Sequence, residues 1–257
     1  MVRRKLHLLV VSEFDISSLF FVTTRHESVF IGRRTMKRLL DTTLALVTIC
    51  VFGPLMLIIA LWIKVTSPGP VLYRGRRVGR HNEAFWILKF RSMVVNAERL
   101  GGSSTSNNDA RITAIGKILR KYKLDELPQC FNVLRGEMSI VGPRPEVQEY
   151  VDLYTEEEEA ILELRPGITD WASIWNSDEG AILAHAEDPD RTYLEVIRPT
   201  KLKLQLLYAR NHRVWVDCKI IASTLLKLVK KNWLPSEIAS YGFLEADVTS
   251  PPQRKAV

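Results

Sequence analysis

The feature that most constrains the fold is an uncharged, hydrophobic stretch at residues 42–63. About 20 apolar residues are enough for a helix to span the hydrocarbon core of a bilayer. The average composition, 46% hydrophobic and 25% charged, is that of an ordinary folded protein. The sequence therefore predicts a globular part that one hydrophobic helix holds at a membrane.

The dipeptide Gly53-Pro54 lies at the midpoint of this stretch. A proline inside a helix removes one backbone hydrogen bond and clashes with the preceding turn, so we expect a kink at Pro54. The two arms, residues 44–53 and 54–63, would each reach only about 15 Å, roughly half the hydrocarbon thickness.

Basic residues flank the hydrophobic stretch on both sides, whereas a single-pass segment normally has one basic side. They are Arg33, Arg34, Lys37 and Arg38 before it, and Lys64, Arg74, Arg76, Arg77 and Arg80 after it. Kink and charges favour a re-entrant helical hairpin over residues 33–66 with both ends in the cytoplasm. A kinked single-pass helix remains the alternative, because proline is tolerated in spanning helices.

The charge balance favours anionic partners. Lys and Arg number 36 against 29 Asp and Glu, which gives a net charge of +7. With a membrane segment present, lipid headgroups and phosphorylated substrates are favoured. The sequence lacks the long basic run with interleaved aromatic residues that would indicate binding to nucleic acid. The three cysteines are far apart and form no zinc or redox pattern, which is typical of reduced thiols facing the cytosol.

Local patterns divide the rest of the chain. We leave residues 1–32 unassigned as an N-terminal extension, expect a catalytic domain over residues 67–243, and expect a disordered tail at 244–257. Residues 71–73 and 84–90 are strand candidates, joined by a basic loop at residues 74–80.

Two stretches are typical of amphipathic helices. One begins at about Ala110 with Asp109 as its N-cap and has a basic outer face. The other, residues 201–231, carries Tyr and Trp among lysines. Both patterns suit a membrane surface, although the first fits a helix packed on a protein core equally well.

The residues that point to chemistry begin at Asp125 and Glu126, which open a predicted helix that stops at Gly136. Carboxylates in a first turn usually serve only as caps. Here Arg120 lies about one turn upstream, and Arg144 is held between two prolines of fixed φ. A rigid guanidinium binds phosphate in a bidentate fork. Carboxylates beside such arginines suit phosphoryl transfer.

Six motifs in order make the sequence resemble the bacterial sugar transferases of the monotopic polyprenyl-phosphate phosphoglycosyl transferase family. After the basic flank they are KRLLD at 37–41, SPGP at 67–70, KFRSM at 89–93, LDELPQ at 124–129, GPRP at 142–145 and RPGIT at 165–169. The resemblance covers about residues 33–230 and includes the helix with Pro54.

The resemblance implies a mostly α fold with minor β structure, a monotopic re-entrant helix and interfacial amphipathic helices. It also implies transfer of a sugar-1-phosphate from a nucleotide sugar to polyprenyl phosphate at the cytoplasmic face of the inner membrane, which initiates a bacterial surface glycan.

Residue roles follow from the same resemblance. Asp125 would attack the phosphate to give a covalent intermediate and would lie near Mg²⁺, while Glu126 would act as a base or position the lipid phosphate. Arg120 and Arg144 would bind phosphates. Lys89 and Arg91 are weaker phosphate candidates, for which a structural role is the alternative.

The sequence departs from the common family pattern after Thr169. Many members continue with Gly-Trp-Ala-Gln-Val, whereas this chain reads DWASIWN at residues 170–176, so the identity of the sugar stays open. Two other classes also remain: a membrane-surface module that binds phosphorylated lipids without catalysis, and a single-pass regulatory protein. The paired carboxylates favour the enzyme, because a pure anion binder does not need them.

Overall fold

The computed structural model describes residues 16–100, 104–230 and 233–241, with side chains from residue 34 onward. The predicted disordered tail, residues 244–257, lies outside the described residues. The described part is mostly helical with little β structure, as predicted. Its principal elements are α1 Ile16–Thr66, β1 Leu72–Val78, β2 Ala84–Phe90, α2 Ala114–Lys121, α3 Gln129–Arg135, β3 Ser139–Val141, α4 Gln148–Val151, β4 Gly167–Thr169, α5 Trp171–Trp175, α6 Glu179–Leu183, α7 Pro189–Thr192, α8 Arg198–Asn211 and α9 Val214–Val229.

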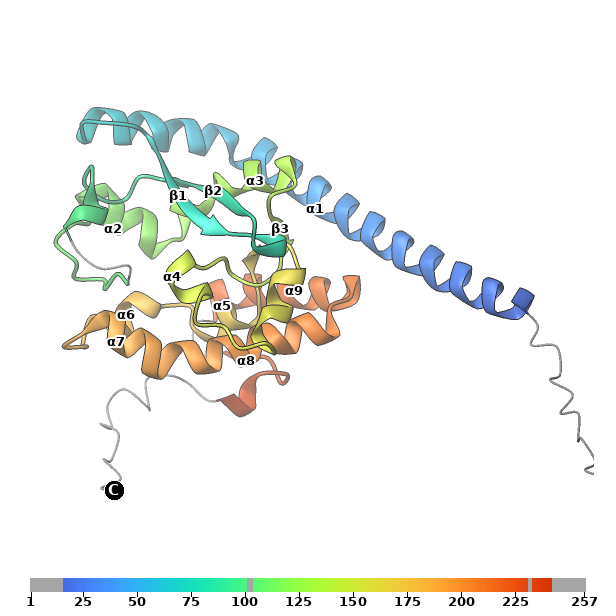
Figure 1. The fold of residues 1–257 in the computed structure, drawn as a ribbon. Helices are drawn as coiled ribbons and strands as arrows, with labels where there is room; N and C mark the ends of the chain where they lie inside the picture. The colour runs from blue at the N-terminus through green and yellow to red at the C-terminus, as the bar shows by residue number, and fades with distance from the viewer. Residues whose placement is uncertain (1–15, 101–103, 231–232, 242–257) are drawn as a thin grey trace, which may run out of the picture.

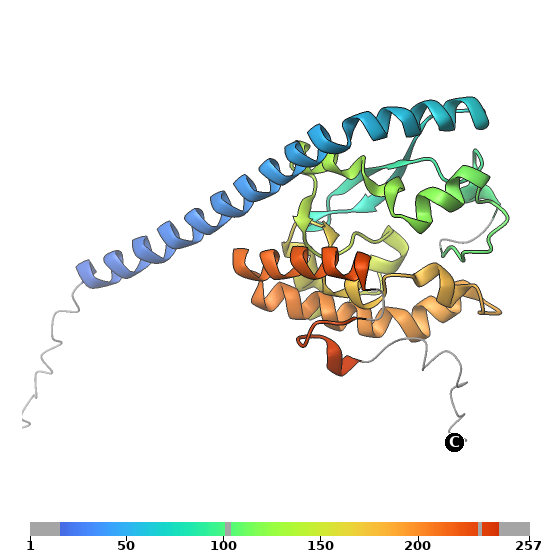
Figure 2. The ribbon, with the colours of Figure 1, turned by 180° about the vertical axis from the view of Figure 1, so that it is seen from behind.

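Helix α1 is one continuous element of 51 residues that passes through Pro54. It takes in residues 16–32, for which the sequence indicated no structure. Figure 1 shows that α1 bends partway along and that its N-terminal part projects away from the rest of the molecule, and Figure 2 shows the same from behind. We attribute the bend to Pro54, the proline inside the helix.

The apolar part of α1 exposes most of its surface. Within the described residues, Arg34–Thr66 is the one helical stretch long and apolar enough to cross a membrane, and only 11% of its most apolar window is buried in the protein. A core helix of a soluble protein would bury most of that window. The exposed side chains include Val51, Leu57, Ile58, Leu61, Trp62 and Val65, so α1 is compatible with membrane association.

A narrow stripe of α1 does pack on the globular part. Ala45 contacts a cluster built from β2 and α3, and Met56, Ile59 and Ile63 pack against Phe90 and α2. In both ribbon views the C-terminal half of α1 lies along the layer that contains β1, β2, α2 and α3.

Polar side chains of the KRLLD motif fix α1 to the same body. Arg38 donates to the carbonyls of Val133 and Leu134 at 2.6 and 2.9 Å, and it thereby caps the C-terminal end of α3. Asp41 is 3% exposed and accepts hydrogen bonds from the Ser139 hydroxyl and the Ile140 N–H, each at 2.9 Å.

Lys37 of α1 contacts the other end of β3. Its Nζ donates to the Val141 carbonyl and to Asp217 of α9, both at 2.9 Å. Tyr208 of α8 donates to the other oxygen of Asp217 at 2.6 Å. These bonds join α1, β3, α8 and α9 in one polar network.

Strands β1 and β2 form the predicted hairpin, but the first strand is longer than expected. Residues 74–78, predicted as loop, belong to β1 and pair with β2 in the register Tyr73 to Lys89 and Arg76 to Trp86. The arginines did not prevent the strand because several of them lie on its exposed face. The turn is confined to residues 79–83.

Two short parallel strands, β3 and β4, bring the GPRP and RPGIT motifs together. A Cβ on Gly142 would lie 2.3 Å from the Arg165 carbonyl oxygen, and one on Gly167 would lie 2.1 Å from the Gly142 nitrogen. Only glycines permit this approach. The Gly167 N–H donates to the Pro143 carbonyl at 2.9 Å, so the loop that carries Arg144 rests on the RPGIT segment.

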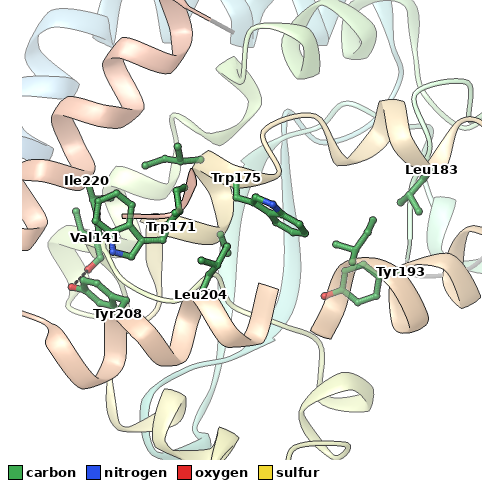
Figure 3. Close-up of a cluster of buried hydrophobic side chains, with 12 residues drawn as sticks. Val141, Trp171, Trp175, Leu183, Tyr193, Leu204, Tyr208 and Ile220 are labelled. Atoms are coloured by element: carbon green, nitrogen blue, oxygen red, sulfur yellow. Dashed lines mark hydrogen bonds between the residues drawn. The ribbon is translucent and has the colours of Figure 1, made fainter. Parts of the chain in front are cut away.

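The C-terminal half folds around a separate hydrophobic core, shown in Figure 3. Trp171 and Trp175 of α5 pack there with Leu204 of α8 and Ile220 of α9. The amphipathic stretch predicted over residues 201–231 is two helices rather than one. They are separated at His212, whose ψ of 122° is extended, and Arg213 is also extended.

The start of α2 also differs from the prediction. The N-cap is Thr113, whose hydroxyl accepts a hydrogen bond from the Gly116 N–H at 3.0 Å. Asp109 instead binds the guanidinium and the backbone N–H of Arg111. A nearby arginine therefore competed successfully for the carboxylate.

The hydrogen bonds that Asp41 of α1 accepts from Ser139 and Ile140 give a first test. We expect Asp41→Ala to lower the free energy of unfolding by about 2–4 kcal/mol, because it leaves the Ser139 hydroxyl and the Ile140 N–H without their acceptor. Thermal unfolding of the protein in detergent measures the change. Thr48→Ala is the matched control on the same helix, since the Thr48 hydroxyl donates to the Leu44 carbonyl within α1, one turn away. Equal stability of Asp41→Ala and wild type would contradict the proposed weight of this contact.

Candidate active site

The two carboxylates predicted as catalytic lie in a short turn between α2 and α3. Residues Leu124–Glu126 form a 3₁₀ turn, and α3 begins only at Gln129. Lys123 precedes the turn with a φ of 56°, in the left-handed region that non-glycine residues seldom adopt. This residue reverses the chain after α2 and directs Asp125 and Glu126 inward. Gly136, at a φ of 83°, ends α3 as predicted.

Glu126 is held between two cations from distant parts of the chain. Its Oε1 accepts from Lys89 Nζ of β2 at 2.8 Å and from Arg144 Nη2 at 2.5 Å, and Arg144 Nη1 lies 3.3 Å from Oε2. Burial favours the neutral acid, but attraction to Arg144 and Lys89 holds the pKa of Glu126 well below its usual range. Attraction to Glu126 in turn raises the pKa of Arg144.

Asp125 has a different environment although it is the next residue. Its side chain is 6% exposed, and within the described residues it accepts no hydrogen bond and forms no ion pair. Burial and the neighbouring charge of Glu126 raise its pKa, against the opposing attraction of Lys89 and Arg120. The two carboxylates therefore differ. Glu126 is ionised and its charge is balanced by two cations, whereas Asp125 has no such partner and is available to react.

Arg120 lies at the end of α2 and is a cation that attracts Asp125. Its guanidinium is half-buried, and it makes no hydrogen bond or ion pair to any residue that the structure describes. Burial lowers its pKa, while attraction to Asp125, Asp109 and Glu126 raises it. A half-buried guanidinium with no partner among the described residues is suited to bind an anion such as phosphate.

Arg91, also predicted to bind phosphate, points elsewhere. Its Nη2 donates to the Ser67 carbonyl at 2.7 Å and its Nη1 to the Pro68 carbonyl. The guanidinium therefore holds the SPGP turn that follows α1, which is the structural alternative considered for it. Lys89, two residues earlier, faces Glu126 because it lies in β2.

Asn132 is a buried residue of α3 that sequence reasoning missed. Its side-chain amide accepts from the Leu88 N–H at 2.9 Å and donates to the Trp86 carbonyl at 2.8 Å. It thus pairs with the free edge of β2 as a neighbouring strand would. This contact ties the strand that carries Lys89 to the helix that follows Glu126. No local pattern marks this contact with β2, because Leu88 and Trp86 are more than 40 residues away from Asn132 in the sequence.

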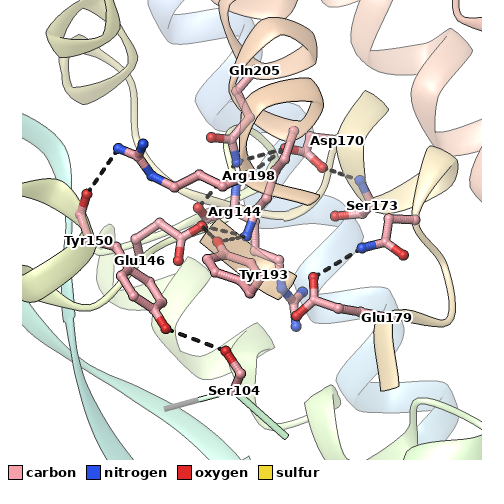
Figure 4. Close-up of polar contacts among 12 residues, drawn as sticks. Ser104, Arg144, Glu146, Tyr150, Asp170, Ser173, Glu179, Tyr193, Arg198 and Gln205 are labelled. Atoms are coloured by element: carbon pink, nitrogen blue, oxygen red, sulfur yellow. Dashed lines mark hydrogen bonds and ion pairs between the residues drawn. The ribbon is translucent and has the colours of Figure 1, made fainter. Parts of the chain in front are cut away.

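A second buried ion cluster supports the loop that carries Arg144 (Figure 4). Glu146 forms an ion pair with Lys201 of α8 and accepts from the Tyr193 hydroxyl at 2.7 Å. Lys201 also donates to Tyr193 at 2.9 Å. These contacts fix the chain two residues beyond Arg144.

The residues present fit a magnesium ion that would take only part of its ligands from the protein. Within the described ranges no cluster of three or more His, Cys, Asp or Glu side chains could form a complete protein cage. Mg²⁺ is commonly bound by one or two carboxylates together with waters and substrate phosphates. The uncommitted carboxylate of Asp125 is an oxygen ligand of this type.

Known proteins resemble this chain over the same region. The sequence profile of the family described as "Bacterial sugar transferase" matches residues 32–231. A UDP-N-acetylgalactosamine-undecaprenyl-phosphate N-acetylgalactosaminephosphotransferase of Aeromonas hydrophila is 39% identical over 193 residues, which are 74% of this chain and 43% of that protein.

Two further relatives differ in how much of their own length the match covers. A UDP-glucose:undecaprenyl-phosphate glucose-1-phosphate transferase of Xanthomonas campestris pv. campestris is 39% identical over 75% of this chain and 38% of its own length. An uncharacterized sugar transferase of Bacillus subtilis is 33% identical over 76% of this chain and 87% of its own. The chain thus spans about two fifths of the first two relatives. The profile match and these identities show that the chain belongs to the bacterial sugar transferase family.

Proposed function

We propose that this protein transfers a sugar-1-phosphate from a nucleotide sugar to polyprenyl phosphate. The observation that carries the proposal is the pairing pattern at the site. Asp125 is buried and Arg120 is half-buried, the two attract each other electrostatically, and neither side chain has a hydrogen-bonding partner in the described residues, while the charge of Glu126 is balanced by Lys89 and Arg144. The names of the A. hydrophila and X. campestris relatives contain a UDP-sugar and undecaprenyl phosphate, which supports these as donor and acceptor.

The chemistry assigned to Asp125 is nucleophilic catalysis in two steps. In the first step, a carboxylate oxygen forms a bond to the sugar-linked phosphorus, the bond to the bridging oxygen breaks, and nucleoside monophosphate leaves. In the second step, a phosphate oxygen of the polyprenyl phosphate attacks the same phosphorus and releases Asp125. The product is a polyprenyl-diphosphate sugar.

Cations at the site stabilise the negative charge in both steps. Among the residues that the structure describes, Arg120 has no partner to release before it binds phosphate, and the side chain of Arg144 is one-third exposed. Magnesium, bound through Asp125 and substrate phosphates, would supply further charge neutralisation. Glu126 is a poor base because its pKa is low, so we assign it to orienting Lys89 and Arg144 toward the phosphates.

We further propose that α1 enters and leaves the same membrane leaflet. Both ends of its apolar stretch contact one globular body: Lys37, Arg38 and Asp41 at one end, and Ile63 at the other. A helix that crossed the bilayer would place these ends on opposite sides. The bend and the two basic flanks are consistent with re-entry and with an active site at the cytoplasmic face of the inner membrane.

Two other elements suit the membrane interface. On α9, Trp215, Leu225, Leu228 and Val229 are exposed. On α2, Ile118 is exposed beside lysines, as is Tyr122 just after the helix. Both helices contact α1. Apolar side chains beside lysines on helices next to a membrane segment are typical of interfacial binding.

The nucleophile assignment predicts that Asp125→Asn separates catalysis from folding. We expect transfer from radiolabelled UDP-sugar to undecaprenyl phosphate to fall by at least about 10³-fold, because an amide cannot replace the carboxylate nucleophile. At pH 7 we expect the melting temperature to rise, because the substitution removes a buried carboxylate whose ionised form is unfavourable in the folded protein.

The sign follows from the raised pKa of Asp125. Its ionised form is less favourable in the folded state, so its destabilising effect appears as the pH rises through the folded pKa. The gain in Asp125→Asn should therefore shrink as the pH falls toward about 4, the usual pKa of aspartate. Asp152→Asn, an exposed residue of the same type, is the control. Wild-type turnover by Asp125→Asn would rule out the nucleophile.

Re-entry predicts that positions on either side of the apolar stretch are accessible from the same side. In a variant that lacks the native cysteines, single cysteines near residue 30 and residue 80 should both react with a membrane-impermeant maleimide only after the cytoplasmic face is opened. Labelling of one position in intact cells would contradict re-entry and support a single-pass helix.

A further inference from the structure

The backbone of Arg144 has few ways to be held in place. Pro143 and Pro145 fix their own φ angles but have no N–H, so Arg144 carries the one backbone donor of residues 143–145. That donor, and the carbonyl of the same residue, are both bound by side chains from other elements (Figure 4). Asp170 Oδ2 accepts from the Arg144 N–H at 3.2 Å, and Gln205 Nε2 donates to the Arg144 carbonyl at 3.3 Å.

Both side chains that bind Arg144 in this way are completely buried. Asp170, just before α5, and Gln205 of α8 are each 0% exposed. They are also bound to each other, because Gln205 Nε2 lies 3.3 Å from Asp170 Oδ2. The contact therefore links α5, α8 and the loop of Arg144 at one point.

Asp170 uses both carboxylate oxygens, which distinguishes it from a simple helix cap. Its Oδ1 accepts from the Ser173 N–H at 2.7 Å and caps α5, while Oδ2 serves Arg144 and Gln205. Asp188 caps α7 in the same manner through Oδ1, at 3.0 Å from the Arg191 N–H, but it is exposed and far from the site loop in sequence. Capping alone does not require the second oxygen of Asp170.

We propose that Asp170 and Gln205 are positioning residues that hold Arg144 for phosphate binding. Arg144 is then held at two points: Glu126 binds its guanidinium, and Asp170 and Gln205 bind its backbone. A displacement of about 1 Å at a catalytic group can cost roughly 10²-fold in rate. The inference rests on the phosphate-binding role proposed for Arg144.

Asp170→Asn tests the inference, because asparagine offers one acceptor oxygen where both are used. We expect kcat/KM for UDP-glucose or UDP-N-acetylgalactosamine, whichever is the better donor, to fall about ten- to a hundredfold. In an Arg144→Ala background the same substitution should cause no further loss, because the residue it positions is gone. Asp188→Asn is the matched control and should keep wild-type activity.

A structural role alone would give a different result. If Asp170→Asn only loosened the fold, its loss would be the same in both backgrounds, and that outcome would overturn the inference. Gln205→Met, which keeps the shape and removes the donor, serves in the same cycle if Asp170→Asn does not fold. Calorimetry measures the affinity for the UDP-sugar in the same four proteins, which are the wild type, the two single variants and the double variant. This tests the positioning role independently of turnover. An active wild type with additive losses contradicts the positioning role, whereas an inactive wild type contradicts the proposed function.

Discussion

The arrangement of the site depends on one shared carboxylate, Glu126, which binds Lys89 from β2 and Arg144 from the loop after β3. Three segments far apart in the sequence meet at this side chain. Removing one partner of a buried ion pair leaves an uncompensated charge, which is strongly destabilising. The cluster therefore fixes the two cations. Because both cations bind Glu126, Asp125 has no ion-pair partner among the described residues. The two neighbouring carboxylates, Asp125 and Glu126, are thus in distinct environments.

The same logic of buried polar contacts attaches the membrane helix. Lys37, Arg38 and Asp41 bind backbone groups of α3 and β3, so α1 cannot shift along its axis without breaking several hydrogen bonds. Two of these partners, α3 and β3, lead directly from Glu126 to Arg144 along the chain. The position of α1 and the position of the candidate active site are therefore coupled by rigid contacts. This suits the proposed reaction, in which one substrate is soluble and the other is anchored in the bilayer.

Features that depend on local chemistry were predictable from the sequence. The hydrophobic helix, the β2 strand and the stop at Gly136 follow from composition, alternation and backbone preference, and the family motifs identified the residues that converge around Glu126. The sequence was a poorer guide where a distant or competing partner decided the outcome. Arg111 binds Asp109, which therefore does not cap α2. The Ser67 and Pro68 carbonyls bind Arg91, in line with the structural alternative given for it. The roles of Asn132, Asp170 and Gln205 arise from contacts across the fold. Such contacts leave no periodic signal in a single sequence.

The central claim is that Asp125 becomes covalently bound to the sugar phosphate. The most direct measurement is mass spectrometry of the purified protein after incubation with UDP-sugar and Mg²⁺ in the absence of polyprenyl phosphate. The account predicts a mass increase equal to one phosphosugar, located on the peptide that contains Asp125, and its loss when undecaprenyl phosphate is added. Release of nucleoside monophosphate only when the lipid acceptor is present, with no adduct at any stage, would contradict the account and indicate direct transfer between the two substrates.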